Sequence, residues 1–147
     1  MGKDRGRHGG YQRKENIREE RKSVVVSDLL TFSFRHLDES QPEDDPQTLE
    51  VWAVERLLPI LLTRLKELSR LSRDEATKQQ LIKVYGDFPV KSDFFAPAHI
   101  DKHVAWGVIK GIGGQKGTVA GYMIENTFYI VFLDKDHRFW ITEKKNT

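Results

Sequence analysis

The chain contains no cysteine, and it has no hydrophobic run long enough to cross a membrane. The lack of cysteine excludes disulfides, thiol catalysis and zinc sites built on cysteine. The longest apolar stretch, residues 57–62, is far shorter than the ~20 residues that a membrane helix needs. The basic N-terminus is not followed by the apolar segment of a secretory signal. We therefore expect a cytoplasmic protein with no membrane partner.

No strict catalytic, metal-binding or nucleotide-binding motif is present in the chain. His99 and His103 are four residues apart, as zinc ligands on a helix are, but no Glu follows His99 and no third ligand is evident. The glycine-rich segment 110–118 differs from a phosphate-binding loop, because its Lys116 precedes Gly117 and a strand is expected to follow. We therefore expect neither a metal nor another cofactor.

The net charge of +2 hides an uneven distribution along the chain. Residues 1–22 carry eight Lys/Arg against four Asp/Glu, residues 23–101 carry nine against fourteen, and residues 102–147 carry seven against four. Because phosphate is attracted to basic surfaces, a nucleic acid would be expected at the two ends rather than in the acidic middle. Solvated charge with no partner is the alternative, and charge counts alone favour it.

The composition divides the chain into two parts. Residues 1–22 have almost nothing to bury, which predicts a disordered basic arm, and residues 23–147 have the size and composition of a single domain. Within that domain, residues 30–35 alternate between apolar and polar types, which indicates an N-terminal strand. The candidate nucleic-acid-binding residues of the arm are Arg5, Arg7, Arg13 and Lys14.

Helical patterns occupy the acidic middle of the chain. The Asp45-Pro46 pair is suited to begin a helix, and apolar residues then recur at intervals of three and four, which predicts a helix over residues 46–71. Pro59 lies inside this pattern and is expected to kink or divide the helix. A capping box predicts a second, shorter helix over residues 72–84.

The last third of the chain has the pattern of antiparallel strands. Two aromatic and β-branched runs, residues 117–125 and 128–133, are separated by a polar turn and predict the end of a meander of about three strands. Side chains alternate along a strand, so Tyr129, Val131 and Leu133 are expected to share one face. The predicted fold class is therefore α+β: an N-terminal strand, a long kinked helix, a short helix and an antiparallel meander, with the helices on one face.

The run at residues 128–133 leads into a charged corner, Asp134-Lys-Asp-His-Arg138. This ending and the order of elements resemble the RelE/ParE superfamily of small toxins, and the ending is also similar to small uncharacterised proteins of bacterial mobile elements. The resemblance covers residues 28–141 as topology and residues 117–140 as local pattern. It implies metal-independent cleavage of RNA at the ribosome and a cognate antitoxin as a partner. The acidic helical region departs from the strongly basic composition that is usual in the family.

Cleavage of that kind needs a base for the ribose 2′-OH, an acid for the leaving 5′ oxygen and cations for the developing negative charge. The resemblance assigns His137 as base or acid, because an imidazole titrates near neutral pH. Arg138 and Lys116 would hold phosphate, and Tyr129 or Tyr122 would stack on a nucleobase or donate a proton. A turn with solvated charges is the alternative interpretation of the corner.

Two further interpretations remain open. Lys110, in the glycine-rich segment, is a candidate phosphate contact. The alternative function is a non-catalytic module that binds nucleic acid or another protein through its basic arm, and it predicts strong salt dependence together with indifference to changes at His137. A homo-oligomeric module that pairs through a sheet edge is a third possibility.

Overall fold

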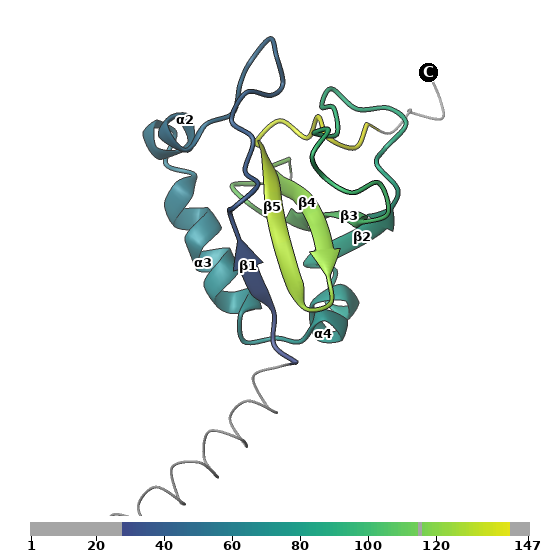
Figure 1. The fold of residues 1–147 in the computed structure, drawn as a ribbon. Coiled ribbons are helices and arrows are strands. Elements are labelled where there is room, and N and C mark those ends of the chain that lie inside the picture. Colours follow the sequence, from purple (N-terminus) through teal and green to yellow (C-terminus); the bar gives the residue numbers. More distant parts are fainter. Residues whose placement is uncertain (1–27, 115, 142–147) are drawn as a thin grey trace, which may run out of the picture.

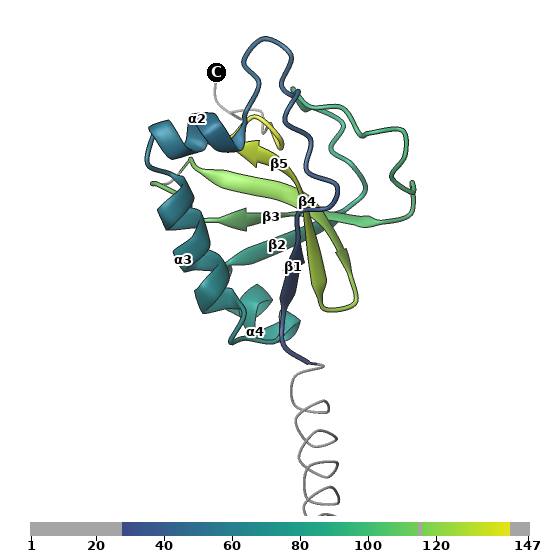
Figure 2. The same cartoon turned by 60° about the vertical axis from the view of Figure 1, so that its left-hand side comes forward.

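The computed structural model describes residues 28–141 except residue 115. Its centre is a five-stranded sheet in the order β1-β5-β4-β3-β2, with helices along one side (Figure 1 and Figure 2). The strands are β1 (Thr31–Ser33), β2 (Ile82–Gly86), β3 (Ala105–Lys110), β4 (Thr118–Ile124) and β5 (Thr127–Asp134). The helices are α2 (Leu49–Val54), α3 (Leu58–Leu68) and α4 (Arg73–Lys78). The predicted α+β class is confirmed.

The sheet is mixed rather than purely antiparallel. The predicted meander is confirmed, since β3, β4 and β5 pair antiparallel in sequence order, and β2 extends it at the far edge. The N-terminal strand β1 pairs parallel with β5 and forms the other edge. No helix in the described part of the chain is long and apolar enough to span a membrane.

The predicted helix over residues 46–71 is two helices. Thr48 caps the first of them by accepting a hydrogen bond from the Val51 N–H, so α2 begins later than predicted. The left-handed backbone of Arg56, with a φ of 62°, follows the end of α2. Pro59 then lies in the first turn of α3, where its missing N–H costs no helical bond. The division expected at Pro59 is therefore present, although Arg56 makes the break.

The second predicted helix is shorter than expected, and the assignment of residues 82–84 to it is wrong. The capping box at Ser72 is present, but α4 ends at Lys78 and β2 follows. Gln80 is left-handed, with a φ of 60°, and the Leu81 N–H bonds the Ala76 carbonyl at 3.0 Å. This closing motif usually uses glycine, so its presence could not be read from the sequence.

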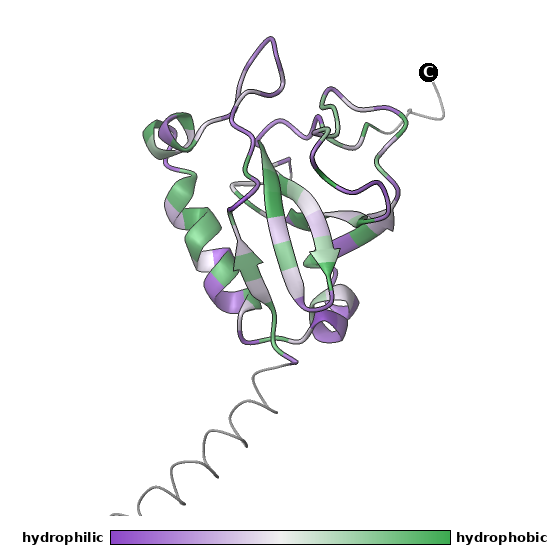
Figure 3. Ribbon diagram, in the orientation of Figure 1, coloured by the Kyte–Doolittle hydropathy of each residue, from purple (hydrophilic) through white to green (hydrophobic). Residues whose placement is uncertain are grey.

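Hydrophobic residues pack on both faces of the sheet. We call the two clusters the helix-side core and the far-side core. The helix-side core joins residues of the helices and of the sheet, including Trp52, Leu61, Leu65, Leu68, Ile109, Val119, Phe128, Ile130 and Leu133. The far-side core contains Phe94, Trp106, Val108, Ala120, Tyr122, Val131, Phe132 and Phe139. Figure 3 shows hydrophobic residues along β5 and the start of α3, whereas α4 and the loops are mainly hydrophilic.

A β-bulge at Val131 changes which face of the sheet the end of β5 presents. The register of β4 and β5 skips this residue, so the alternation of side chains reverses beyond it. Phe132 consequently lies in the far-side core and Leu133 in the helix-side core. The expectation that Tyr129, Val131 and Leu133 share one face is therefore wrong for Leu133. Gly121 permits the close approach here, since a Cβ at this position would lie 1.8 Å from the Tyr129 carbonyl oxygen.

Candidate functional site

The charged corner that follows β5 is a turn organised by Asp134. This side chain is only 2% exposed, and its carboxylate accepts hydrogen bonds of 2.8 Å from the backbone N–H groups of both Arg138 and Phe139. Thr118 lies beside it, with its Oγ1 3.4 Å from the carboxylate. Burial raises the pKa of Asp134, and the backbone hydrogen bonds offset part of this effect. Asp134 thus supports the backbone of the turn.

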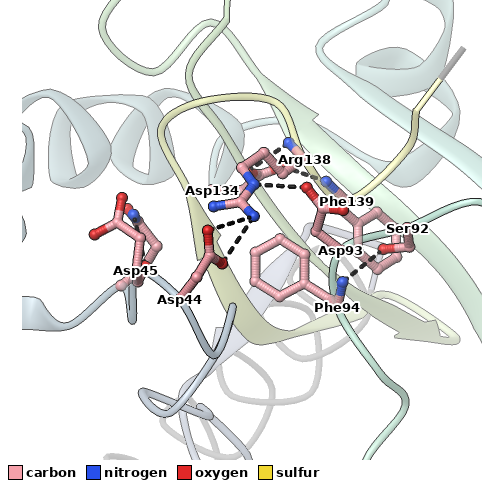
Figure 4. A network of polar contacts seen from close by, with 9 residues as sticks. Asp44, Asp45, Ser92, Asp93, Phe94, Asp134, Arg138 and Phe139 are labelled. Atoms are coloured by element: carbon pink, nitrogen blue, oxygen red, sulfur yellow. Dashed lines mark hydrogen bonds and ion pairs between the residues drawn. The ribbon is translucent and has the colours of Figure 1, made fainter.

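Arg138 links the turn to two other loops (Figure 4). Its guanidinium group lies 2.6 Å from a carboxylate oxygen of Asp93 and 2.8 Å from one of Asp44. These hydrogen bonds, that to Asp44 first, raise the pKa of Arg138, and the bond from Arg138 lowers the pKa of Asp44. The Asp93 N–H also bonds the Arg138 carbonyl at 3.0 Å. A phosphate that approached Arg138 would therefore have to compete with two carboxylates.

The lysines proposed for phosphate lie at the same end of the sheet as the corner. Thr118 pairs with Asp134 on one side and with Lys110 on the other. Lys116 is exposed and lies two residues before Thr118. His137 is exposed as well, and its backbone is left-handed with a φ of 60°. These residues share one edge of the domain, and their catalytic and binding roles stay predictions.

Tyr129 lies at the opposite end of β5 from the corner. It pairs with Tyr122, five residues before Asp134. A strand rises by about 3.3 Å per residue, so roughly 16 Å separates it from Asp134. The structure therefore does not bring Tyr129 together with His137. The remaining candidates, Arg5, Arg7, Arg13 and Lys14, lie outside the described residues.

Four rings from three separate segments meet at this opposite end on the far side of the sheet. The His36 ring lies 5.2 Å from that of His99, 6.4 Å from Tyr122 and 6.2 Å from Tyr129, measured between centroids. Tyr122 and Tyr129 stack at 4.8 Å with an interplanar angle of 10°. We call these four residues the histidine–tyrosine cluster.

The segment that follows β1 carries His36 to the cluster. A turn in which the Leu37 N–H bonds the Phe34 carbonyl at 3.0 Å reverses the chain there. The Asp38 N–H then bonds the carbonyl of Val131 at 2.7 Å. The bulge residue of β5 thus anchors the His36 segment beside the tyrosines. Side-chain alternation before the bulge places Tyr129 on that same face.

Gln41 connects the His36 segment to the loop that carries His99. Its amide accepts from the Phe95 N–H at 2.6 Å and donates to the Phe95 carbonyl at 3.0 Å. The same amide donates to Asp38 at 2.9 Å. Two hydrogen bonds of this side chain therefore join the two loops, with His36 in one and His99 in the other, and the third fixes the amide within its own loop.

An open cavity of about 530 Å³ lies beside the cluster and is lined by Arg35, His36, Leu37, Asp38, Glu39, Ser40 and His99. Burial, followed by the positive charges of His99 and Arg35, lowers the pKa of His36. Burial tends to raise the pKa of Asp38, but hydrogen bonds from Ser40 and Gln41 outweigh it and leave that pKa lowered. The cavity therefore offers a neutral imidazole, a second imidazole, a guanidinium group and a fixed carboxylate.

The tyrosines form a firm support behind the imidazoles. Tyr122 is 4% exposed and packs edge to face on Trp106 at 5.7 Å. Burial, and then the neighbouring Tyr129, raises the pKa of Tyr122, so its phenol stays protonated at neutral pH. Tyr129 is half-buried and keeps part of its surface accessible. Such an arrangement can stack on a planar ligand and donate hydrogen bonds to it.

Sequence reasoning did not single out His36 or Arg35, and it considered His99 only as a metal ligand. Residues 99–103 are not helical, and His99 faces His36 instead of sharing a helix face with His103. No group of three or more His, Asp or Glu side chains in the described residues is arranged to hold a metal. The available signal was a histidine shortly after the N-terminal strand, but the parallel pairing that brings β1 beside β5 and its tyrosine is not evident from sequence.

Comparisons of the chain with protein-family models, with curated proteins and with solved structures returned no match.

Proposed function

We propose that the protein binds single-stranded RNA at the histidine–tyrosine cluster and cleaves it without a metal ion. The observation that carries this proposal is the pair of imidazoles whose centroids lie 5.2 Å apart at the edge of an open cavity. Two imidazoles can supply both the base and the acid that metal-independent RNA cleavage requires. The resemblance to RelE/ParE toxins supports the same reaction class, with other residues in the catalytic roles.

Binding would use the rings and the guanidinium group of the cavity. Aromatic rings bind unpaired bases of any sequence by stacking, and Tyr129 and His36 present partly exposed rings. Arg35 is exposed beside them and can form paired hydrogen bonds with a phosphate. The half-buried Asp38 adds a negative charge to the cavity wall. Phosphate is therefore directed to Arg35 rather than to Asp38.

The chemistry assigns the two histidines different roles. His36 has the lowered pKa, so its neutral ring accepts the proton of the ribose 2′-OH. The 2′ oxygen attacks phosphorus and forms a 2′,3′-cyclic phosphate, while the bond from phosphorus to the 5′ oxygen breaks. The His99 ring gives a proton to that 5′ oxygen, and Arg35 stabilises the negative charge on the phosphorane.

Incubation of purified protein with a labelled single-stranded RNA in EDTA tests this function directly. We expect cleavage to 2′,3′-cyclic phosphate ends, and a loss of at least about 100-fold in rate for either His36→Ala or His99→Ala. His103→Ala and His137→Asn are matched controls outside the cluster and should keep the wild-type rate. Asn is chosen at position 137 because it tolerates the left-handed backbone there.

The same assay separates the catalytic proposal from its alternative. RNA that binds but stays intact would contradict cleavage and leave the non-catalytic binding module. Loss of cleavage in His137→Asn with full activity in His36→Ala would return the active site to the charged corner. Binding that depends steeply on salt, and that does not change in any of the four variants, would favour attachment through the basic arm.

A toxin role adds a prediction in cells. Inducible expression in a bacterial host is expected to arrest growth with degradation of RNA, and His36→Ala and His99→Ala should relieve both effects at equal soluble expression. Normal growth of the host at good wild-type expression would contradict the toxin role in that host, whereas the assay with purified protein would still decide the cleavage activity.

A further inference from the structure

A second pocket, of about 250 Å³, lies on the other side of the loop that carries His99. Its walls include Phe88, Pro97, Ile100 and Trp106, and the rings of Phe88 and Trp106 meet edge to face at 4.9 Å. We call it the Trp106 pocket. Ala98 and Ile100 line it, whereas His99 between them lines the cavity of the histidine–tyrosine cluster. One turn of the chain therefore separates the two spaces.

Packing and hydrogen bonds give this dividing turn a defined shape. The Ile100 N–H bonds the Pro97 carbonyl at 3.1 Å, which closes the turn around His99. On the floor, Trp106 is 2% exposed and contacts Tyr122 of the cluster. Trp106 and Tyr122 thus form one aromatic layer that reaches from the Trp106 pocket to the cluster.

The polar groups of the Trp106 pocket select what can enter it. Asp87, Asp101 and Lys102 line it, so two carboxylates stand against one ammonium group. The Asp101 carboxylate is held in place because it accepts a hydrogen bond of 2.7 Å from the His103 N–H. Carboxylates repel phosphate and accept hydrogen bonds from amino groups. An aromatic, apolar wall with an acidic rim therefore suits a planar group that carries an amino donor.

We propose that the Trp106 pocket is a base subsite that receives the nucleobase next to the one held at the histidine–tyrosine cluster. The pocket favours bases with an exocyclic amino group, such as cytosine, over uracil, which presents a carbonyl at the same place. This inference rests on the proposed binding of RNA at the cluster, and it adds a preference for sequence that stacking on the tyrosines alone does not provide.

Binding of short 2′-O-methyl oligonucleotides measures the subsite without cleavage, because these strands lack the attacking hydroxyl. Fluorescence anisotropy in EDTA at one fixed salt concentration compares five-residue oligo-C with oligo-U. The wild type is expected to bind oligo-C about fivefold more tightly, the effect of one net hydrogen bond. Ala98→Phe fills the pocket and should remove this preference, and Asp87→Asn combined with Asp101→Asn should reduce it.

The matched control is Val90→Phe, which adds the same ring at a fully exposed position that does not line the pocket. It should keep the preference, and thermal unfolding should show that every variant is folded. Equal affinity of the wild type for oligo-C and oligo-U, with binding still weakened by His36→Ala, would overturn the subsite and leave the proposed function standing. No binding of either oligonucleotide would overturn both. A preference that persists in folded Ala98→Phe would also overturn the subsite.

Discussion

The charged corner and the histidine–tyrosine cluster lie at opposite ends of β5, and they differ in how their polar groups are satisfied. At the corner, Arg138 is matched by two carboxylates and the carboxylate of Asp134 is matched by backbone N–H groups. In the cluster, His36 and His99 contact other rings beside an open cavity. The first is centred on charges that are adjacent in sequence and takes its two other carboxylates from distant loops, whereas the second is assembled from distant segments throughout. The comparison indicates that the dense run of charges is engaged in contacts within the fold, whereas the dispersed rings leave surface open beside a cavity.

Of the changes considered, removal of the Asp134 carboxylate should lower the free energy of unfolding most, because this group holds the backbone of the corner. Asp134→Ala leaves two N–H groups in the protein interior without their acceptor, and we expect the free energy of unfolding to fall by about 3 kcal/mol. Urea denaturation measures it. The exposed Asp136→Ala should change the free energy by less than about 0.5 kcal/mol. If Asp134→Ala cost no more than its neighbour, the corner would not be a structural element.

Arg138→Gln should be milder, because both carboxylate partners are partly exposed to water. We expect a loss of about 1–2 kcal/mol in the free energy of unfolding, and unchanged affinity of the folded variant for oligonucleotides. A double-mutant cycle with Asp93→Asn should show that the two residues are coupled. Weaker RNA binding by a fully folded Arg138→Gln would contradict the comparison, since it would make the corner a phosphate contact.

Gln41→Leu should sharpen the comparison from the side of the cluster. The change removes the hydrogen bonds between the two histidine-bearing loops, so we expect a loss of about 1 kcal/mol in stability. RNA cleavage should slow by more than this loss explains, because His99 is then free to move away from His36. Cleavage kinetics well below the unfolding temperature measure the effect. The control is Gln79→Leu at the exposed end of α4; equal rates for the two variants would show that Gln41 does not position the site.

The smallest effect concerns the titration of His36. Its pKa in the folded protein is lowered, so the unfolded chain takes up this proton first as the pH falls. Stability is therefore complete above the ordinary pKa of about 6.5 and is lost gradually below it. NMR titration of the imidazole carbons should place His36 below that ordinary value. His99→Asn and Arg35→Gln each remove a positive charge and should raise the pKa of His36 again. A wild-type His36 that titrates at or above its ordinary value would show that the two imidazoles do not interact.

Local patterns predicted the elements whose signals are local. The capping box at Ser72, the divided helix around Pro59 and the two strands at the end of the chain are all present. The ends of α2 and α4 were not predictable, because Arg56 and Gln80 adopt the left-handed backbone where glycine is the usual sign. The strand β2 was missed because Gln80 hides the end of α4 and because the residues of β2 continue an apolar pattern that also fits a helix.

The candidate site depends on contacts that no local pattern encodes. Tyr129 or Tyr122 was predicted to stack on a nucleobase or donate a proton, but the histidines beside them come from loops whose positions follow from the pairing of β1 with β5 and from the bonds of Gln41. The reversal of alternation after Val131 likewise requires the register of two strands, which periodicity in one strand cannot give. Tertiary pairing, rather than residue type, assembles the cluster.

The β-bulge at Val131 determines which face of the sheet the last residues of β5 occupy. With strict alternation, Asp134 would lie on the same face as Phe128 and Ile130, among the apolar side chains beneath the helices. The bulge instead lets one continuous strand present Tyr129 to the ring cluster and Asp134 to the turn on the same side of the sheet. Regular pairing of the same residues, without the bulge, would exchange Phe132 with Leu133 between the two cores and direct the Asp134 carboxylate into the helix layer, whereas deletion of Val131 would leave all three on their present faces. The bulge therefore keeps the rings around Tyr129 and the turn around Asp134 on one side of the sheet, although the five-residue spacing of these two residues would otherwise place them on opposite sides.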